Sequence, residues 1–455
     1  MKCGALWAPS AAWAMPAALR WPGVAALVLY AAFGILLPPL GDPAETLCAL
    51  LGLGAVLACG KGLRGSAALW LLLAALLVQT LSWLMGYWHH PEWVADNPQL
   101  DRLAKLFIFI ALAWWLGGST RNTLLVWSLA LLGYVVASFT HGNGLQEWWL
   151  GLQGQRVGFG IRNLQHGSML FGVALLGLTM FTPRFARVGG RLTPWRLAVS
   201  LVLIGVCLVG IAIGQTRAVW LAIVLALLAA AALWGGWLVT RDRGHGKTRV
   251  KPLLLAGAGM LMIFSLLAVA FQDTLSERLT QESTVVAQLL QGDVEAVPYT
   301  SIGIRIHSWR AALEWIAERP LVGWGGEGRS LVMAHTAWLP DDVKAEFGHL
   351  HNYLLEVWVA YGLLGVLVIL VLAVWIGRGT WLAWRAGVMP NDVALFGVAF
   401  FVYWMVVNQF EAYNAFGTGV YVHNLVVGGL VTHIWRWQWQ SGRQVFSLPA
   451  RKVTS

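Results

Sequence analysis

The sequence has few charged residues. Only 11% of its 455 residues are Asp, Glu, Lys or Arg, whereas 58% are hydrophobic. Because a soluble globular chain carries about 25% charged residues, this composition excludes a protein that faces water on all sides. The apolar residues fall in runs of about 20, the length of helix that crosses roughly 30 Å of hydrocarbon. We therefore predict an all-α integral membrane protein.

Cysteine and phosphate-binding motifs are scarce as well. The four cysteines are Cys3, Cys48, Cys59 and Cys207. Three of them lie in apolar runs and none has metal-ligand spacing, so we expect small hydrophobic side chains and no disulfide or zinc site. The glycine-rich stretch Gly323–Gly328 follows no predicted strand, which excludes a dinucleotide or P-loop site. We interpret Asp341 and Asp342 as an exposed helix start, and we predict neither cofactor nor metal.

Twelve apolar runs predict about twelve transmembrane helices. They cover residues 21–39, 44–60, 66–87, 103–118, 122–140, 166–182, 197–214, 218–239, 252–271, 351–376, 391–410 and 419–435. The first run follows Lys2 and Arg20 and resembles a signal peptide, but no small-residue cleavage site follows it, so we interpret it as an uncleaved span. Three regions result: 1–196 with loop 141–165, a core at 197–376 with the long loop 272–350, and a C-terminal part at 377–455.

The charges are unevenly distributed between the connecting segments. One alternate set of segments, with both termini, holds 20 Lys and Arg against two acids, Asp242 and Asp392, whereas the other set holds 11 against 19. Basic segments stay in the cytoplasm, so we predict a multi-pass membrane protein with both termini cytoplasmic. This rule accounts for the net charge of +10 without a nucleic-acid partner.

Tryptophan is abundant and concentrates near the predicted span ends. The sequence has 28 tryptophans, and those near span ends include Trp88, Trp93, Trp114, Trp115, Trp148, Trp149, Trp195, Trp381, Trp435 and Trp437. We interpret them as anchors at the membrane–water interface. In the long outward loop, Ile304–Glu318 predicts an amphipathic helix with Ile306, Trp309, Leu313 and Ile316 on one apolar stripe. Pro320 and the following glycines should end it.

Three outward positions could bind an anion or accept a proton. Arg217 lies in a short hairpin between two spans, where it could reach phospholipid phosphates or face an anion in a cavity. Arg305 lies four residues before Trp309, so the two can share a helix face. His349 and His351 lie where the long loop enters the tenth span, and they could be a plain interfacial pair or provide a base for a sugar hydroxyl. Zinc binding is disfavoured because His349 and His351 are two residues apart and no Cys or outward HxxxH pattern completes a site.

These residues resemble the motifs of the O-antigen ligases. The family signature is a histidine and a polar residue, a gap of nine residues and then Gly-x-x-Gly. It resembles His351-Asn352 followed, after nine residues, by Gly362-Leu363-Leu364-Gly365. Arg217, in Gln-Thr-Arg-Ala-Val-Trp, resembles the start of the domain that O-antigen ligases share with O-antigen polymerases. The stretch from Arg305 to Trp324, with Glu-Arg-Pro-Leu-Val-Gly-Trp-Gly, resembles the next block of that domain. The resemblance covers residues from about 200 to 365.

The resemblance implies a metal-independent, inverting glycosyltransferase of lipopolysaccharide biosynthesis. It would transfer O-antigen from undecaprenyl diphosphate to a sugar hydroxyl of lipid A–core oligosaccharide, at the periplasmic face of the inner membrane. By position, His351 would be the general base, and Arg217 and Arg305 would hold the diphosphate. We predict Arg162, next to Asn163, as a further phosphate contact. The other candidate substrate-binding residues are Asn352 and His349, the latter without a clear family role.

Other functions stay open at this stage. An O-antigen polymerase or a protein O-oligosaccharyltransferase would use the same donor and similar arginines. A transporter of lipid-linked glycan belongs to another class, and it would place ionisable groups near the bilayer midplane. Glu356 is the one candidate for such a group, and it could instead support the site near His351.

Overall fold

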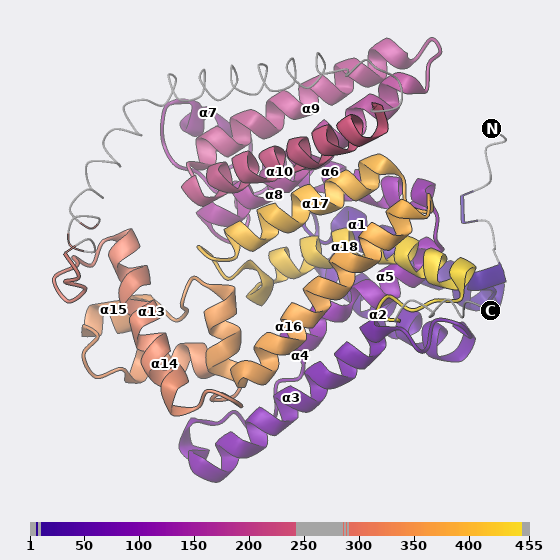
Figure 1. Cartoon of the computed structure of the whole chain (residues 1–455). Helices are drawn as coiled ribbons and strands as arrows, with labels where there is room; N and C mark the ends of the chain where they lie inside the picture. Colours follow the sequence, from indigo (N-terminus) through magenta and orange to yellow (C-terminus); the bar gives the residue numbers. More distant parts are fainter. Residues whose placement is uncertain (1–5, 8–10, 243–284, 286–287, 289–290, 448–455) are drawn as a thin grey trace.

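The structure, a computed structural model, is helical throughout the residues that it describes (Figure 1), which are 6–7, 11–242, 285, 288 and 291–447. No strand occurs in these ranges. Seven of the described helices are long and apolar enough to cross a membrane. The prediction of a multi-pass, all-α membrane protein is therefore confirmed for this part of the chain.

The elements of the first half, in order, are η1 (Ala11–Trp13), α1 (Ala17–Phe33), α2 (Pro38–Cys59), α3 (Ala67–His89), η2 (Pro91–Trp93), α4 (Asp101–Ala104), η3 (Lys105–Phe107), α5 (Phe109–Leu116), α6 (Thr120–Thr140), α7 (Leu145–Leu152), α8 (Leu164–Arg187), α9 (Thr193–Gly214) and α10 (Arg217–Asp242). The second half has α13 (Ser301–Glu318), α14 (Gly328–His335), α15 (Asp341–Glu346), α16 (Tyr353–Arg385), α17 (Asn391–Val407), η4 (Tyr413–Ala415) and α18 (Gly417–Ser441). Helical segments occupy the predicted runs within these ranges, and the run 252–271 lies outside them.

The helices form a bundle with two different ends. At one end, the short helices α13, α14 and α15 form a separate layer (Figure 1), whose buried side chains make a small core of their own. At the other end, Arg184 of α8 is paired with Asp392 of α17, and Arg436 donates to the backbone oxygen of Gly118. The segments that are rich in Lys and Arg therefore meet at the end opposite the α13–α15 layer.

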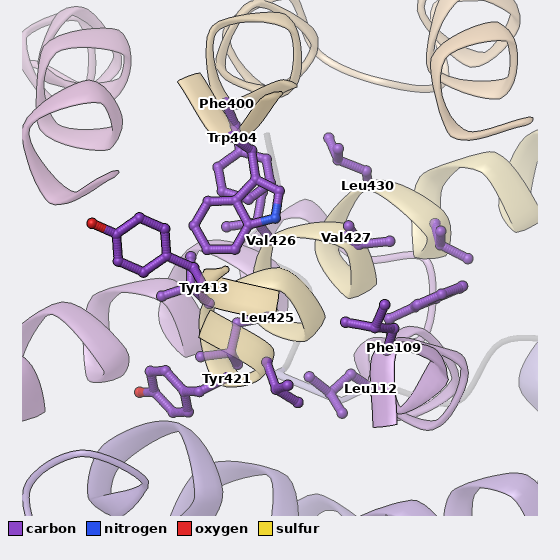
Figure 2. Packing of buried hydrophobic residues seen from close by; sticks show 14 of the residues in the cluster. Phe109, Leu112, Phe400, Trp404, Tyr413, Tyr421, Leu425, Val426, Val427 and Leu430 are labelled. Atoms are coloured by element: carbon purple, nitrogen blue, oxygen red, sulfur yellow. The ribbon is translucent and has the colours of Figure 1, made fainter. Parts of the chain in front are cut away.

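Helix α18 is the central helix of the bundle. Nearly all its residues from Gly419 to Gln438 are buried. Figure 2 shows its side chains between aromatic residues of α17 on one side and α5 on the other, with Trp404 and Phe109 as examples. Since α18 is surrounded by protein and not by lipid, it can include polar residues such as Asn424 and His433. This polarity keeps it outside the set of seven helices that are long and apolar enough to cross a membrane.

The polar residues of α18 stabilise an interrupted helix beside it. The chain from α4 through η3 to α5 is broken, so some of its backbone groups lack the usual helical partner. Asn424 accepts a hydrogen bond from the Phe109 N–H (2.8 Å) and donates to the Lys105 oxygen (2.7 Å). Thr432 accepts from the Gly118 N–H at 2.7 Å. Irregular backbone at membrane depth is tolerated only where protein satisfies it in this way.

Helix α16 is also interrupted, at the first glycine of the motif Gly362-x-x-Gly365. Gly362 has φ 64° and ψ −166°, a conformation that is essentially restricted to glycine. Four backbone bonds join the break to the segment after α13: Leu363 N–H to Pro320 O (2.8 Å), Leu364 N–H to Leu321 O (3.3 Å), Trp324 N–H to Val359 O (2.8 Å) and Gly325 N–H to Ala360 O (2.8 Å). The two sequence blocks that resembled one family therefore pack against each other.

Two interpretations of apolar residues were partly wrong. Trp88 and Trp195 are exposed at helix ends, as anchors should be, but Trp114, Trp115 and Trp435 are fully buried in the core. Trp114 and Trp115 belong to α5 and Trp435 to α18. These two helices pack against each other, and tertiary packing there outweighs the preference of tryptophan for the interface.

The apolar stripe predicted for α13 was also wrong in one position. The helix begins at Ser301, where Thr300 caps it by accepting a hydrogen bond from the Gly303 N–H. Its buried face passes through Ala311, Ala312 and Trp315, whereas Leu313 is 56% exposed. Both faces of this helix carry apolar residues. The face with Trp315 is the buried one because Trp315 packs on Trp324.

The break in α16 gives a testable prediction for stability. A Cβ at position 362 would lie 2.1 Å from the carbonyl carbon of Leu321, and its backbone conformation is strained for any other residue. We expect Gly362→Ala to lower the free energy of unfolding by about 1–3 kcal/mol, measured as a lower Tm in detergent. Gly377→Ala is the matched control because a Cβ there meets nothing within 4 Å. Equal melting of the two variants would contradict this account of the break.

Candidate active site

The loop that carries His349 and His351 is fixed through the residue between them. The Leu350 side chain is buried in the small core of the α13–α15 layer. Its N–H donates to Glu356 Oε1 at 3.1 Å, and its oxygen accepts from Trp309 Nε1 of α13 at 2.9 Å. Because both backbone groups and the side chain of Leu350 are held, the two imidazoles have defined positions.

Both histidines contact one buried carboxylate. His349 Nε2 lies 3.1 Å from Glu411 Oε1, and His351 Nδ1 lies 3.0 Å from Glu411 Oε2. The two rings are 3.9 Å apart between centroids. Glu411 is 1% exposed and lies between α17 and η4, about 60 residues after the histidines. The backbone of His351 has φ 53°, and such left-handed non-glycine residues are concentrated at functional sites.

The electrostatic surroundings set the protonation of these groups. Burial by itself raises the pKa of Glu411, but hydrogen bonds from His349 and His351 outweigh it and leave this pKa well below its ordinary value. Burial lowers the pKa of His351, and nearby His349 and Arg305 lower it further, although Glu411 partly opposes them. At neutral pH, Glu411 is therefore ionised and His351 is neutral.

These protonation states determine which nitrogen of His351 can react. An ionised Glu411 only accepts hydrogen bonds, so the proton of the neutral imidazole resides on Nδ1. The lone pair on Nε2 then points away from the carboxylate and can accept a proton. A neutral imidazole that is oriented by a carboxylate is the usual arrangement of a general base.

A cationic cavity lies beside this group. It has a volume of about 500 Å³, and its lining includes Arg156, Arg217 and Arg305 but no carboxylate among the described residues. Trp309 lines it with Arg305, so the prediction that the two share a helix face is confirmed. Arg305 is electrostatically coupled to both Glu411 and His351, which places this cavity next to the imidazoles. Three arginines in the lining of one cavity suit an anionic ligand such as a diphosphate.

The other predicted site residues are placed differently. Arg162 lies over the ring of Phe416, at 4.2 Å, and lines a separate cavity. The arginine of loop 141–165 that joins the cationic cavity is Arg156, whose Nε donates to the Gly214 oxygen. Asn163 and Asn352 are the N-caps of α8 and α16, where their side-chain oxygens accept backbone hydrogen bonds.

Sequence reasoning did not identify Glu411 or select Arg156. Glu411 was detectable in principle, because it is the one acid between the predicted eleventh and twelfth spans, on the same side as His351. For Glu356, the sequence left two roles open, a charged group of a transporter or a support for the site near His351. Its contacts fit the second role. It accepts from Leu350 and from Arg329, whose NH1 lies 3.2 Å away.

The same cluster contains the described residues that could hold a metal ion. Ligand atoms of His349, His351 and Glu411 all lie within 4.8 Å of one another. The prediction of no metal was based on the lack of a Cys or an HxxxH pattern that would complete a site with the two histidines, and the fold brings Glu411 to them. Metal dependence is therefore a question for experiment.

One comparison with known proteins matched a family model over part of the chain. Residues 201–370 match the family model described as O-antigen ligase. This region is O-antigen ligase-like, as its motifs predicted, and members of the family are membrane glycosyltransferase-type enzymes. The match includes Arg217, Arg305 and His351 but ends before Glu411. A search of curated proteins gave no match.

The surroundings of His351 predict its titration. Because its pKa is lowered, the imidazole should take up its proton at a pH below about 6.5, the ordinary histidine value. Glu411→Gln should move this midpoint further down, since the carboxylate favours the protonated ring. The measurement is NMR of ¹³C-labelled histidine, with the His351 signal assigned by its loss in His351→Gln. Glu314→Gln, on the exposed face of α13, should leave the midpoint unchanged, and an upward shift in Glu411→Gln would contradict the arrangement.

Proposed function

We propose that the protein is an inner-membrane O-antigen ligase, with its O-antigen ligase-like region at residues 201–370. It transfers glycan from undecaprenyl diphosphate to a sugar hydroxyl of lipid A–core oligosaccharide. One observation carries the proposal: a cavity whose described lining includes three arginines and no carboxylate lies beside a neutral imidazole held by Glu411. The first suits an anionic leaving group, and the second suits an alcohol that must lose a proton.

The reaction follows from these two features. The acceptor hydroxyl attacks the anomeric carbon of the donor sugar while its proton passes to His351 Nε2. A new C–O bond forms as the bond between the anomeric carbon and the diphosphate breaks, with inversion at that carbon. Ionised Glu411 stabilises the imidazolium that results. Arg217, Arg305 and Arg156 neutralise the charge that develops on the departing lipid diphosphate.

Both substrates are lipids, which is consistent with the location of the site. The arginine cavity and the histidines lie at the end of the bundle with the α13–α15 layer, opposite the basic segments. If the basic segments are cytoplasmic, this end faces the periplasm. A donor and an acceptor that are anchored in the outer leaflet can then meet there.

Substitutions in the arginine cavity test the proposal. Purified protein should transfer glycan from the undecaprenyl-diphosphate donor to lipid A–core in the presence of EDTA. His351→Ala should abolish transfer, and Arg217→Lys or Arg305→Lys should reduce it by about 10²–10³, because a lysine lacks the planar fork of arginine. Arg310→Lys is the control, since Arg310 lies on the same helix but pairs with Glu295 and Glu314 at the surface.

Two results would overturn parts of this proposal. Near-normal transfer by the two cavity lysine variants would exclude bidentate diphosphate binding. Transfer that EDTA abolishes and a divalent cation restores would instead make His349, His351 and Glu411 a metal site.

An O-antigen polymerase is the second candidate, because the family covers polymerases too. The spacing of His351-Asn352 and Gly362-x-x-Gly365 favours a ligase. We therefore expect cells without the protein to lose O-antigen from lipid A–core while undecaprenyl-linked polymer accumulates. The measurement is gel analysis of lipopolysaccharide alongside the extracted lipid-linked glycan. Single O-antigen units still attached to the core would instead identify a polymerase.

A further inference from the structure

A second cavity of about 500 Å³ lies near the histidine loop, which its lining residue Glu356 contacts through the Leu350 N–H. It lies between the start of α4, α14, the first turns of α16 and the segment before α18. Its lining includes Gln99, Arg102, Arg329, Tyr353, Tyr361 and Asn414. A volume of this size is typical of small-molecule sites, and the reaction proposed above assigns no role to this cavity.

The cations that line this cavity are all paired with carboxylates. Arg102 NH2 lies 3.0 Å from Glu327, Arg329 NH1 lies 3.2 Å from Glu356, and Lys105 Nζ lies 2.8 Å from Asp101. Each cation that lines the cavity is thus bonded to a carboxylate. A phosphate would have to compete with those carboxylates, so the cavity favours an uncharged polar ligand.

Two tyrosines of the lining have buried hydroxyls that could bond to such a ligand after a small side-chain movement. The Tyr353 and Tyr361 hydroxyls are buried and have no hydrogen-bond partner among the described residues. The rings are only 7% and 4% exposed, and both line the cavity. Buried hydroxyls are nearly always bonded. A phenol that can both donate and accept is well matched to the hydroxyls of a sugar.

The cavity shares a wall with the reacting group. Glu356, which lines it, also accepts from Leu350 between the two histidines. Arg329, which also lines it, lies over the ring of Phe416 at 5.7 Å, and the same ring packs on His349 at 5.5 Å. A sugar in this cavity therefore lies one layer of side chains from the proposed base.

We propose that this charge-paired cavity binds uncharged sugar residues of the acceptor glycan, while the arginine cavity binds the diphosphate of the donor. The inference rests on the proposed function. It assigns the two substrates to opposite sides of the histidine–glutamate group, and it makes Tyr353 and Tyr361 determinants of acceptor binding.

The test is steady-state kinetics with each substrate varied separately. The double variant Tyr353→Phe, Tyr361→Phe removes two hydroxyls and little else. It should raise the acceptor KM by about tenfold and leave the donor KM within about twofold. Arg156→Lys should do the reverse. Tyr299→Phe, at an exposed tyrosine before α13, is the matched control and should change neither KM.

A binding measurement separates this inference from the proposed function. Saturation-transfer NMR would use a deacylated, dephosphorylated core oligosaccharide and the wild-type protein. We expect binding that weakens in the double variant, and also in Asn97→Trp, which adds bulk at an exposed position of the lining without emptying the interior. Binding without any glycan transfer would refute the proposed function and leave the cavity assignment standing. Unchanged acceptor KM and unchanged binding in both variants, or a rise in the donor KM alone, would overturn the assignment.

Discussion

The structure depends on one constraint, which is that backbone polar groups in an apolar medium must be satisfied by other protein groups. The chain is interrupted at Gly362 within α16 and between α4 and α5. The first break is closed by backbone bonds from the segment 320–325, and the second by side chains of α18 such as Asn424. Each interruption therefore requires a specific neighbour, and these requirements fix which helices lie side by side.

The break in α16 also positions the reacting groups. By holding the segment after α13, it places α14 against α16, where Arg329 can reach Glu356. Glu356 in turn holds the N–H of Leu350, and Trp309 of α13 holds its oxygen. The geometry of His351 is thus continuous with the backbone pairing at Gly362. A glycine eleven residues from the proposed base can therefore matter to catalysis without contacting a substrate.

The sequence predicts those features that depend on neighbouring residues in the chain, such as apolar runs and short motifs. Length and hydropathy predict the helices, and the resemblance singles out Arg217, Arg305 and His351. Glu411 is separated from the histidines by two helices, so its contact with both follows only from the fold. The burial of α18 also follows only from the fold. Its polar residues are misleading in the sequence, because a helix surrounded by protein need not be apolar. Asn163 and Asn352 look like ligand-binding residues in sequence because a helix cap and a binding group favour the same side chain.

The contrast between the two cavities extends this reasoning from single residues to substrates. A lining with three arginines and, among the described residues, no carboxylate raises the local potential and favours an anion. Where each lining cation is bonded to a carboxylate, the charges cancel and hydrogen bonding is the main basis for recognition. A transferase that joins a diphosphate-activated sugar to an alcohol needs both environments, one on each side of the proton acceptor. His351 lies beside the first through Arg305 and beside the second through Leu350 and Glu356. The histidine loop therefore lies between a cavity that can bind the charged leaving group and a cavity that can bind the acceptor sugar. Both substrates can then meet at the bond between the anomeric carbon and the diphosphate.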